Sequence, residues 1–178
     1  MKSNIVIIDN QGHGYDEAIL ETKKVSEYNG LDYKNTIRLQ LCAEELLSMA
    51  RSITGEIKAS FWIENEQAQY ELHLATETVM DKEKRDLLIA ASSSRKNEAA
   101  DSFLGKLRNM FESAMAGSPD HSDDVPDDAL SDLANHTIEC TDEEWDGYEQ
   151  STLRRLADTI KIGIRGDKVE MTVIKSFA

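Results

Sequence analysis

Two adjacent glutamates, Glu44 and Glu45, are the residues of this chain best suited to chemistry by type and position. A carboxylate held at the edge of a pocket can orient a water molecule or accept a proton. The surrounding stretch, residues 35–53, has the pattern of a long amphipathic helix, with Glu45 directly beside its apolar stripe. Glu45 can therefore enter a pocket between this helix and a sheet, or lie on the polar edge of a surface helix. The sequence leaves both interpretations open.

The helix that must position Glu45 is predicted by apolar residues at three- and four-residue spacing. Its apolar stripe consists of Leu39, Ala43, Leu46, Leu47, Ala50 and Ile53. Glu45 falls beside this stripe, in line with Cys42 and Met49. We expect Cys42 to be a buried packing residue, because a small thiol behaves as an apolar group in a core.

The other elements are predicted from the period of their apolar residues, which is two in strands and 3.6 in helices. Strand patterns occur at residues 5–9, 57–64, 69–76, 159–164 and 169–175, and helical patterns at 15–28, 82–91, 98–115 and 145–158. Turns are expected at residues 65–67 and 165–168. This order predicts an α/β (α+β) two-layer sandwich, with one mainly antiparallel, mixed sheet and the helices packed on one of its faces.

The charge of the chain is unevenly distributed. The formal net charge is −14, and 13 of the 34 acidic residues lie between Arg108 and Arg154, an interval without Lys or Arg. Nucleic-acid and anionic membrane partners are not expected, because both are bound by clustered cations. A basic protein partner is compatible with this balance. We expect one domain over residues 1–178, with an acidic, mobile insertion around residues 116–147.

Composition also bears on location and metals. No apolar run is long enough to span a bilayer, and residues 1–10 lack the apolar region of a signal peptide, so a cytoplasmic protein is expected. Cys42 and Cys140 have no metal-type spacing. His121 lies among Asp residues, but this stretch lacks the glycine and the closing glutamate of a calcium-binding loop. No metal site is therefore predicted.

The order of these elements, together with Glu-Glu-Leu-Leu at residues 44–47, resembles the histidine-kinase-like (GHKL, Bergerat) ATPase fold. The most similar variant is the small bacterial anti-sigma-factor type of serine kinase, whose C-terminal end resembles residues 153–158 and the two strands that follow. The resemblance covers most of the chain in layout. It implies the topology of that fold, a site for ATP and magnesium, and a homodimer, which members of the family often form.

The resemblance implies a role for five positions of this chain. In the family, a helix glutamate orients a water, and an asparagine four residues later ligates magnesium. An Asp-x-Gly motif after a strand reads the adenine, and a glycine-rich lid covers the phosphates. These positions correspond to Glu45, Met49, Thr76, Thr78 and Gly147.

Several of these positions depart from the family's pattern. Met49 replaces the asparagine, and a thioether is a poor ligand for magnesium, which requires oxygen. Thr76 offers a hydroxyl in place of the adenine-reading carboxylate. Glu149, two residues after Gly147, replaces a second lid glycine and repels phosphate. The resemblance therefore implies the fold together with lost or weakened ATP binding.

Three hypotheses follow from the sequence. The first is a regulatory protein of the bacterial cytoplasm with this fold, which binds no cofactor and acts through protein–protein contacts. The alternative is an ATP- and magnesium-dependent serine kinase with a divergent active site, in which Glu45 is the base. The third is an interaction protein of similar layout that is unrelated to the family and has no cavity beneath the 35–53 helix.

Overall fold

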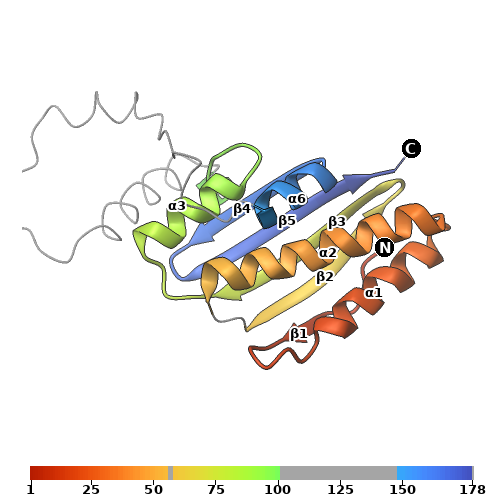
Figure 1. The fold of residues 1–178 in the computed structure, drawn as a ribbon, viewed down its shortest axis with the longest axis horizontal. Helices are drawn as coiled ribbons and strands as arrows, with labels where there is room; N and C mark the ends of the chain where they lie inside the picture. The colour runs from red at the N-terminus through yellow and green to blue at the C-terminus, as the bar shows by residue number, and fades with distance from the viewer. Residues whose placement is uncertain (56–57, 101–147, 178) are drawn as a thin grey trace, which may run out of the picture.

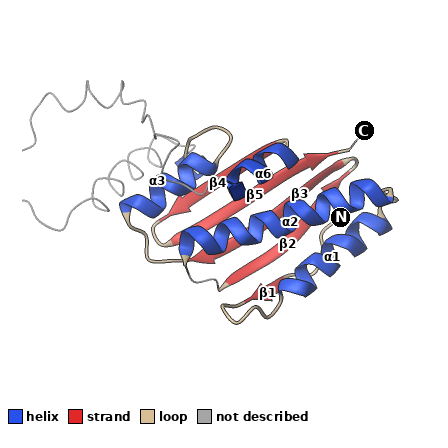
Figure 2. Cartoon of the chain, in the orientation of Figure 1, coloured by secondary structure: helices blue, strands red, loops and turns tan. Residues whose placement is uncertain are grey.

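The computed structural model describes residues 1–55, 58–100 and 148–177, and in them the chain forms two layers (Figure 1). One layer is a five-stranded sheet, and the other consists of α-helices packed on one face of that sheet (Figure 2). All pairings between the described strands are antiparallel. The predicted two-layer sandwich is therefore confirmed, with a sheet that is antiparallel where a mixed one was expected.

The centre of the sheet contains the predicted hairpin, formed by β2 (Ala59–Glu66) and β3 (Gln69–Glu77). Buried and partly exposed residues alternate along both strands, as the period of two predicts. The turn lies at residues 67–68, whereas the sequence predicted it at 65–67. Asn65 remains in β2, and its side-chain amide donates to the carbonyls of Gln67 in the turn and Gln69 at the start of β3, at 3.0 Å each.

The C-terminal hairpin adds two strands beside β3. β5 (Lys168–Ser176) pairs with β3, and β4 (Thr159–Arg165) pairs with β5 at the edge of the sheet. The hairpin turns at Gly166, whose φ of 60° is a left-handed conformation that suits glycine. β1 (Val6–Ile8) forms the other edge, so the strand order is β1-β2-β3-β5-β4. The sheet thus joins segments from both ends of the chain.

α2 (Tyr33–Thr54) is the long helix that positions Glu45, and it crosses the middle of the sheet (Figure 1). It begins after Asp32, whose side chain accepts a hydrogen bond from the Asn35 amide at 2.7 Å. It ends at Gly55, where φ is 75°. Every residue of the predicted apolar stripe is at most 4% exposed, which confirms the helix and the face that it buries.

Three other helices of the described residues lie in this layer. They are α1 (Tyr15–Tyr28), α3 (Lys82–Ala91) and α6 (Tyr148–Leu156). α1 and α3 have the predicted bounds, and α3 begins after Asp81, whose side chain accepts from the Lys84 amide at 2.7 Å. None of the described helices has the length and apolar character needed to cross a membrane.

The outer edge of β4 is covered by the chain that follows α3. The Ser93 amide donates to the Ile160 carbonyl, and the Ser93 hydroxyl accepts from the Ile160 amide, both at 2.8 Å. The buried Asn97 side chain bonds both backbone groups of Ile164 in the same way, at 2.9 and 2.8 Å. The short 3-10 turn η1 (Glu98–Ala100) follows beside β4. An edge whose polar groups are satisfied in this way is closed to a further strand.

Some predicted segments lie outside the described residues. They are the 98–115 helix beyond residue 100, the acidic insertion around 116–147, Gly147, His121, Cys140 and the first residues of the 145–158 helix. Where these two helices are described, η1 begins at Glu98 and α6 ends at Leu156.

Candidate functional site

α2 places Glu45 and Met49 one helical turn apart, as predicted, but in different surroundings. Met49 is 1% exposed and belongs to the apolar core, whereas Glu45 is half-buried. A thioether enclosed in an apolar core supplies no oxygen ligand and gives no access to a hydrated magnesium ion. Of the two candidates on α2, Glu45 therefore offers an oxygen ligand and Met49 does not.

The buried thiol of Cys42 lies one turn before Glu45, and several charged groups act on its pKa. Burial raises the pKa of Cys42 to about 12, and the charges of Lys175, Asp158 and Glu45 also act on it. Lys175 and Asp158 form an ion pair at 2.7 Å. Burial opposes ionisation of Asp158, but hydrogen bonds from Lys175 and the Ser176 amide hold its pKa below the usual value. Cys42 is thus a protonated packing residue, and its predicted burial is confirmed. The charges that act on it, besides Glu45, are those of Lys175 and Asp158, which neutralise each other.

The two adenine-reading candidates, Thr76 and Thr78, both donate hydrogen bonds to backbone carbonyls of other segments. The hydroxyl of Thr76, a residue that is 5% exposed, donates to the Lys58 carbonyl at 3.2 Å. The Thr78 amide donates to the Asp167 carbonyl in the β4–β5 turn at 2.8 Å. These hydrogen bonds join the end of β3 to the residue before β2 and to the β4–β5 turn. The structure thus brings together the two candidates on α2, while the lid candidate Gly147 lies outside the described residues.

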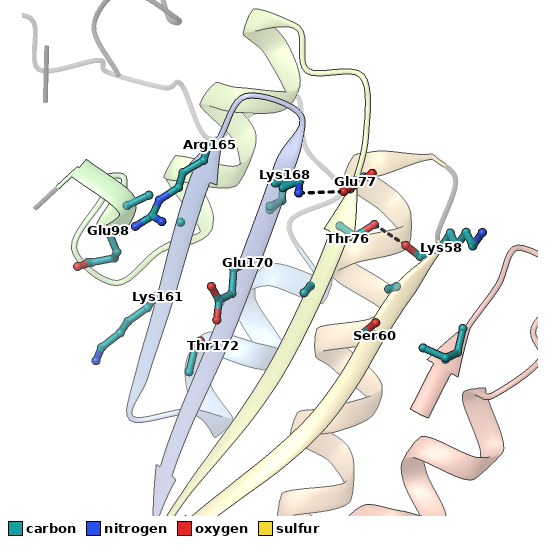
Figure 3. Close-up of a pocket in the computed structure, with 16 residues that line it drawn as sticks. Lys58, Ser60, Thr76, Glu77, Glu98, Lys161, Arg165, Lys168, Glu170 and Thr172 are labelled. Atoms are coloured by element: carbon teal, nitrogen blue, oxygen red, sulfur yellow. Dashed lines mark hydrogen bonds and ion pairs between the residues drawn. The ribbon is translucent and has the colours of Figure 1, made fainter. Parts of the chain in front are cut away.

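A hollow of about 850 Å³ lies on the sheet face that is turned away from the α-helices, which we call the open face (Figure 3). It exists because small side chains lie in one row across the sheet. Strand pairing aligns, from β1 to β4, Ile7, Ser60, Ala75, Glu170 and Gly163. Ser60, Ala75 and Gly163 leave the space above the sheet unfilled, and Ala99 of η1 lies over Gly163 at one end.

Basic side chains surround this open-face hollow. They are Lys58, Lys161, Arg165 and Lys168 (Figure 3). Lys168 lies 3.5 Å from Glu77, and the other three pair with no acid among the residues that the structure describes. Glu98 accepts a hydrogen bond from a serine hydroxyl at 2.5 Å, and Glu170 lies 4.0 Å from the His73 ring, so four cations and three acids line the hollow. The hollow is therefore locally cationic in a chain whose net charge is −14.

A stacked aromatic pair occupies the next row of the open face. The rings of Trp62 and His73 have centroids 4.9 Å apart and an interplanar angle of 4°. His73 Nδ1 lies 3.1 Å from the Thr172 hydroxyl, and its Nε2 lies 3.6 Å from Glu71, beyond hydrogen-bond distance. Burial lowers the pKa of His73 by more than the surrounding carboxylates raise it, so the ring is neutral at neutral pH.

The sequence locates α2 and Glu45 but misses the open-face hollow. The alternation of β2 places Lys58 and Trp62 on one face, and the same period relates Lys161 and Arg165 on β4. The strand order, which the sequence does not supply, places all four on one side of one sheet. Such a site can be predicted from polar residues that alternate along neighbouring strands, provided that the pairing register of those strands is known.

No protein-family model matches this chain, and no curated protein matches it in a sequence comparison. Its function is therefore inferred from its own residues.

Proposed function

We propose that this protein is a regulator with the histidine-kinase-like ATPase fold, which acts in a bacterial cytoplasm through protein–protein contacts and whose ATP binding is lost or weakened. The fold is supported by the order of the elements, in which α1 and α2 precede the β2–β3 hairpin and, among the described residues, α3 and α6 precede the β4–β5 hairpin. The single observation that carries the functional part is the burial of Met49.

Met49 occupies the position of the magnesium ligand, one turn after Glu45. Magnesium requires near-ideal octahedral coordination by oxygen and is commonly held by one or two protein groups together with substrate phosphates. Met49 supplies sulfur in place of oxygen, and at 1% exposure its side chain lies in the core. Because the metal ties the phosphates to the protein, its loss weakens the binding of ATP.

Thr76 supports the same conclusion for adenine. A carboxylate accepts a charge-assisted hydrogen bond, which is roughly twice as strong as a neutral one. The hydroxyl of Thr76 is neutral, and its proton is donated to the Lys58 carbonyl. It is therefore a weaker acceptor for an adenine amino group than the carboxylate that the family uses.

The open face supports a role in protein contacts. Ile5 and Ile7 are 58% and 59% exposed at its β1 edge, next to a hollow rimmed by basic side chains. Exposed apolar side chains that lie together and are rimmed by polar groups are typical of surfaces that bind other proteins.

A second candidate function is an ATP-dependent serine kinase with a divergent active site, and the retention of Glu45 favours it. In that reaction the serine oxygen attacks the γ-phosphorus, the bond to the ADP oxygen breaks, and Glu45 accepts the hydroxyl proton. Glu45 is half-buried on α2, a position from which a carboxylate can take this role.

Thermal unfolding with and without nucleotide separates the two functions. A ligand at 100 times its Kd stabilises a protein by about 2.7 kcal/mol. The regulator predicts an unchanged melting temperature in millimolar ATP with magnesium. A magnesium-dependent rise that disappears in Glu45→Ala would favour the kinase. A rise that needs no magnesium and persists in Glu45→Ala would indicate a non-catalytic nucleotide site.

A further inference from the structure

We propose that the open face of the sheet docks an acidic, amphipathic helix of a partner protein. The inference rests on the proposed function, in which the chain acts through protein contacts, and it names the surface and the chemistry of the partner.

The shape of the open face suits an element that lies across the strands. The row of small residues, Ser60, Ala75 and Gly163, runs perpendicular to the strands and floors the hollow of about 850 Å³. The outer edge of β4 is already satisfied by Ser93 and Asn97, so a partner cannot add a strand there. A helix laid over the face makes its contacts through side chains and needs no free strand edge.

The charges of the open face select the partner's acidic groups. Lys161 and Arg165 stand on β4, and Lys58 precedes β2, so these cations, which pair with no acid in the described part of the chain, flank the hollow on both sides. Among the acids that line the hollow, Glu77 pairs with Lys168, whereas Glu98 and Glu170 keep their charges, so the three remaining cations outnumber the two remaining acids. Carboxylates on an incoming helix therefore meet cations whose charge is not yet neutralised.

The apolar part of the open face selects a partner with an apolar stripe. Ile7 lines the hollow and is 59% exposed, and Ile5 is 58% exposed. Burial of such side chains contributes about 25 cal/mol per Å² of apolar area removed from water. A helix with apolar residues on one face and acids along its sides satisfies both parts of the surface.

Two other occupants are less compatible with these observations. A nucleic acid carries dense negative charge and meets the long-range repulsion of a chain with net charge −14. A second copy that packed by the same face would place two surfaces with an excess of cations against each other, because a two-fold contact pairs a surface with itself. A short acidic helix needs only the local cations, which dominate within a Debye length of about 8 Å.

A peptide titration tests the docking surface on the full chain. Trp145→Phe leaves Trp62, on the open face, as the sole tryptophan. The probe is a synthetic peptide of about 18 residues, roughly five helical turns, with Leu on one face and Glu on the other. Matched peptides carry Gln or Lys in place of Glu. We expect a saturable change in Trp62 emission and a calorimetric signal with the Glu peptide, and weaker binding at high salt.

Charge reversal locates the contact. The double variant Lys161→Glu/Arg165→Glu should weaken binding of the Glu peptide by at least about tenfold, because like charges then face each other. The control, Lys34→Glu/Lys82→Glu, has the same change in net charge in the first turns of α2 and α3, where acids are tolerated. Its affinity should equal that of the parent.

Several results would overturn the proposal. They are equal affinity in the two double variants, equal binding of the Lys peptide, binding of a DNA oligonucleotide through the same cations, or self-association that the Lys161→Glu/Arg165→Glu change abolishes. If no peptide binds and the melting temperature does not respond to ATP, the docking proposal is contradicted and the proposed function stands. If the melting temperature rises with ATP and the peptide binds, the docking proposal stands and the loss of ATP binding is contradicted.

Discussion

Met49 and Glu45 are one turn apart on α2, yet their replacement should have different effects on stability. Met49→Ala removes a side chain that is 1% exposed and leaves a cavity, which should cost about 2–5 kcal/mol of unfolding free energy. Glu45→Ala truncates a half-buried group outside the apolar core and should cost less than Met49→Ala. Urea unfolding of both variants measures the difference. Equal costs would show that Met49 is not held in the core.

His73 should make the stability of the protein depend on pH in the mildly acidic range. Its pKa in the folded state lies below the ordinary value of 6.5, chiefly because the ring is buried. The unfolded chain therefore binds more protons as the pH falls below 6.5, and the unfolding free energy decreases until the folded-state pKa is passed. Protonation inside the fold is opposed by burial and by Lys2, although Glu64, Glu71 and Glu170 favour it.

The His73→Gln variant should lose this part of the pH dependence. Urea unfolding at about pH 7.5 and about pH 5.5, either side of the ordinary histidine pKa, provides the measurement. His13→Gln, which replaces a histidine exposed near Asp9, is the control and should retain the decrease. A decrease of the same size in His73→Gln would assign the effect to other groups.

At the residue scale, the sequence predicts which side chains are buried better than what they do. The burial of Cys42 and of the α2 stripe is confirmed, because helical spacing fixes which residues share a face. The hydroxyl of Thr76 bonds the Lys58 carbonyl, a contact that depends on strand pairing. The sequence therefore named Thr76 as a candidate without being able to say which group it contacts.

At the scale of elements, the start of α1 depends on two glycines of different function. Gly12 and Gly14 both have positive φ, 86° and 81°. A Cβ at Gly12 would meet nothing within 4 Å, whereas a Cβ at Gly14 would lie 2.1 Å from the Ile7 carbonyl oxygen. Gly14 thus permits the close approach of the α1 N-terminus to β1.

Alanine substitution should separate the two roles. Gly12→Ala should cost about 1–2 kcal/mol, the penalty of a left-handed conformation for a residue with a Cβ. Gly14→Ala should cost clearly more, because its Cβ also displaces the backbone of β1. Denaturant unfolding of the matched pair measures the difference. Similar costs for both variants would contradict the close approach.

The elements themselves are largely predictable, and their arrangement is not. α1 and α3 have the predicted bounds because apolar spacing, and for α3 an Asp cap, mark them in the sequence. The β2–β3 turn differs because the Asn65 side chain satisfies the turn carbonyls from within the strand. The position of β5 between β3 and β4 follows from long-range pairing, and this pairing creates the row of small residues that forms the hollow.

At the scale of the whole molecule, charge is distributed differently from what the net value suggests. The net charge of −14 is compatible with a basic protein partner. The open face instead gathers Lys58, Lys161 and Arg165 around one hollow, which fits an acidic partner. Both contacts are compatible with one chain, because the thirteen acids between Arg108 and Arg154 and these cations belong to different segments.

Isothermal titration of the full chain with ATP, in the presence and absence of magnesium, is the most direct test of the central claim that α2 has lost its metal ligand and with it tight nucleotide binding. With Met49 buried in the core, no saturable heat of binding is expected at millimolar nucleotide. A saturable, magnesium-dependent signal that disappears in Glu45→Ala would contradict the claim and identify α2 as a working nucleotide site.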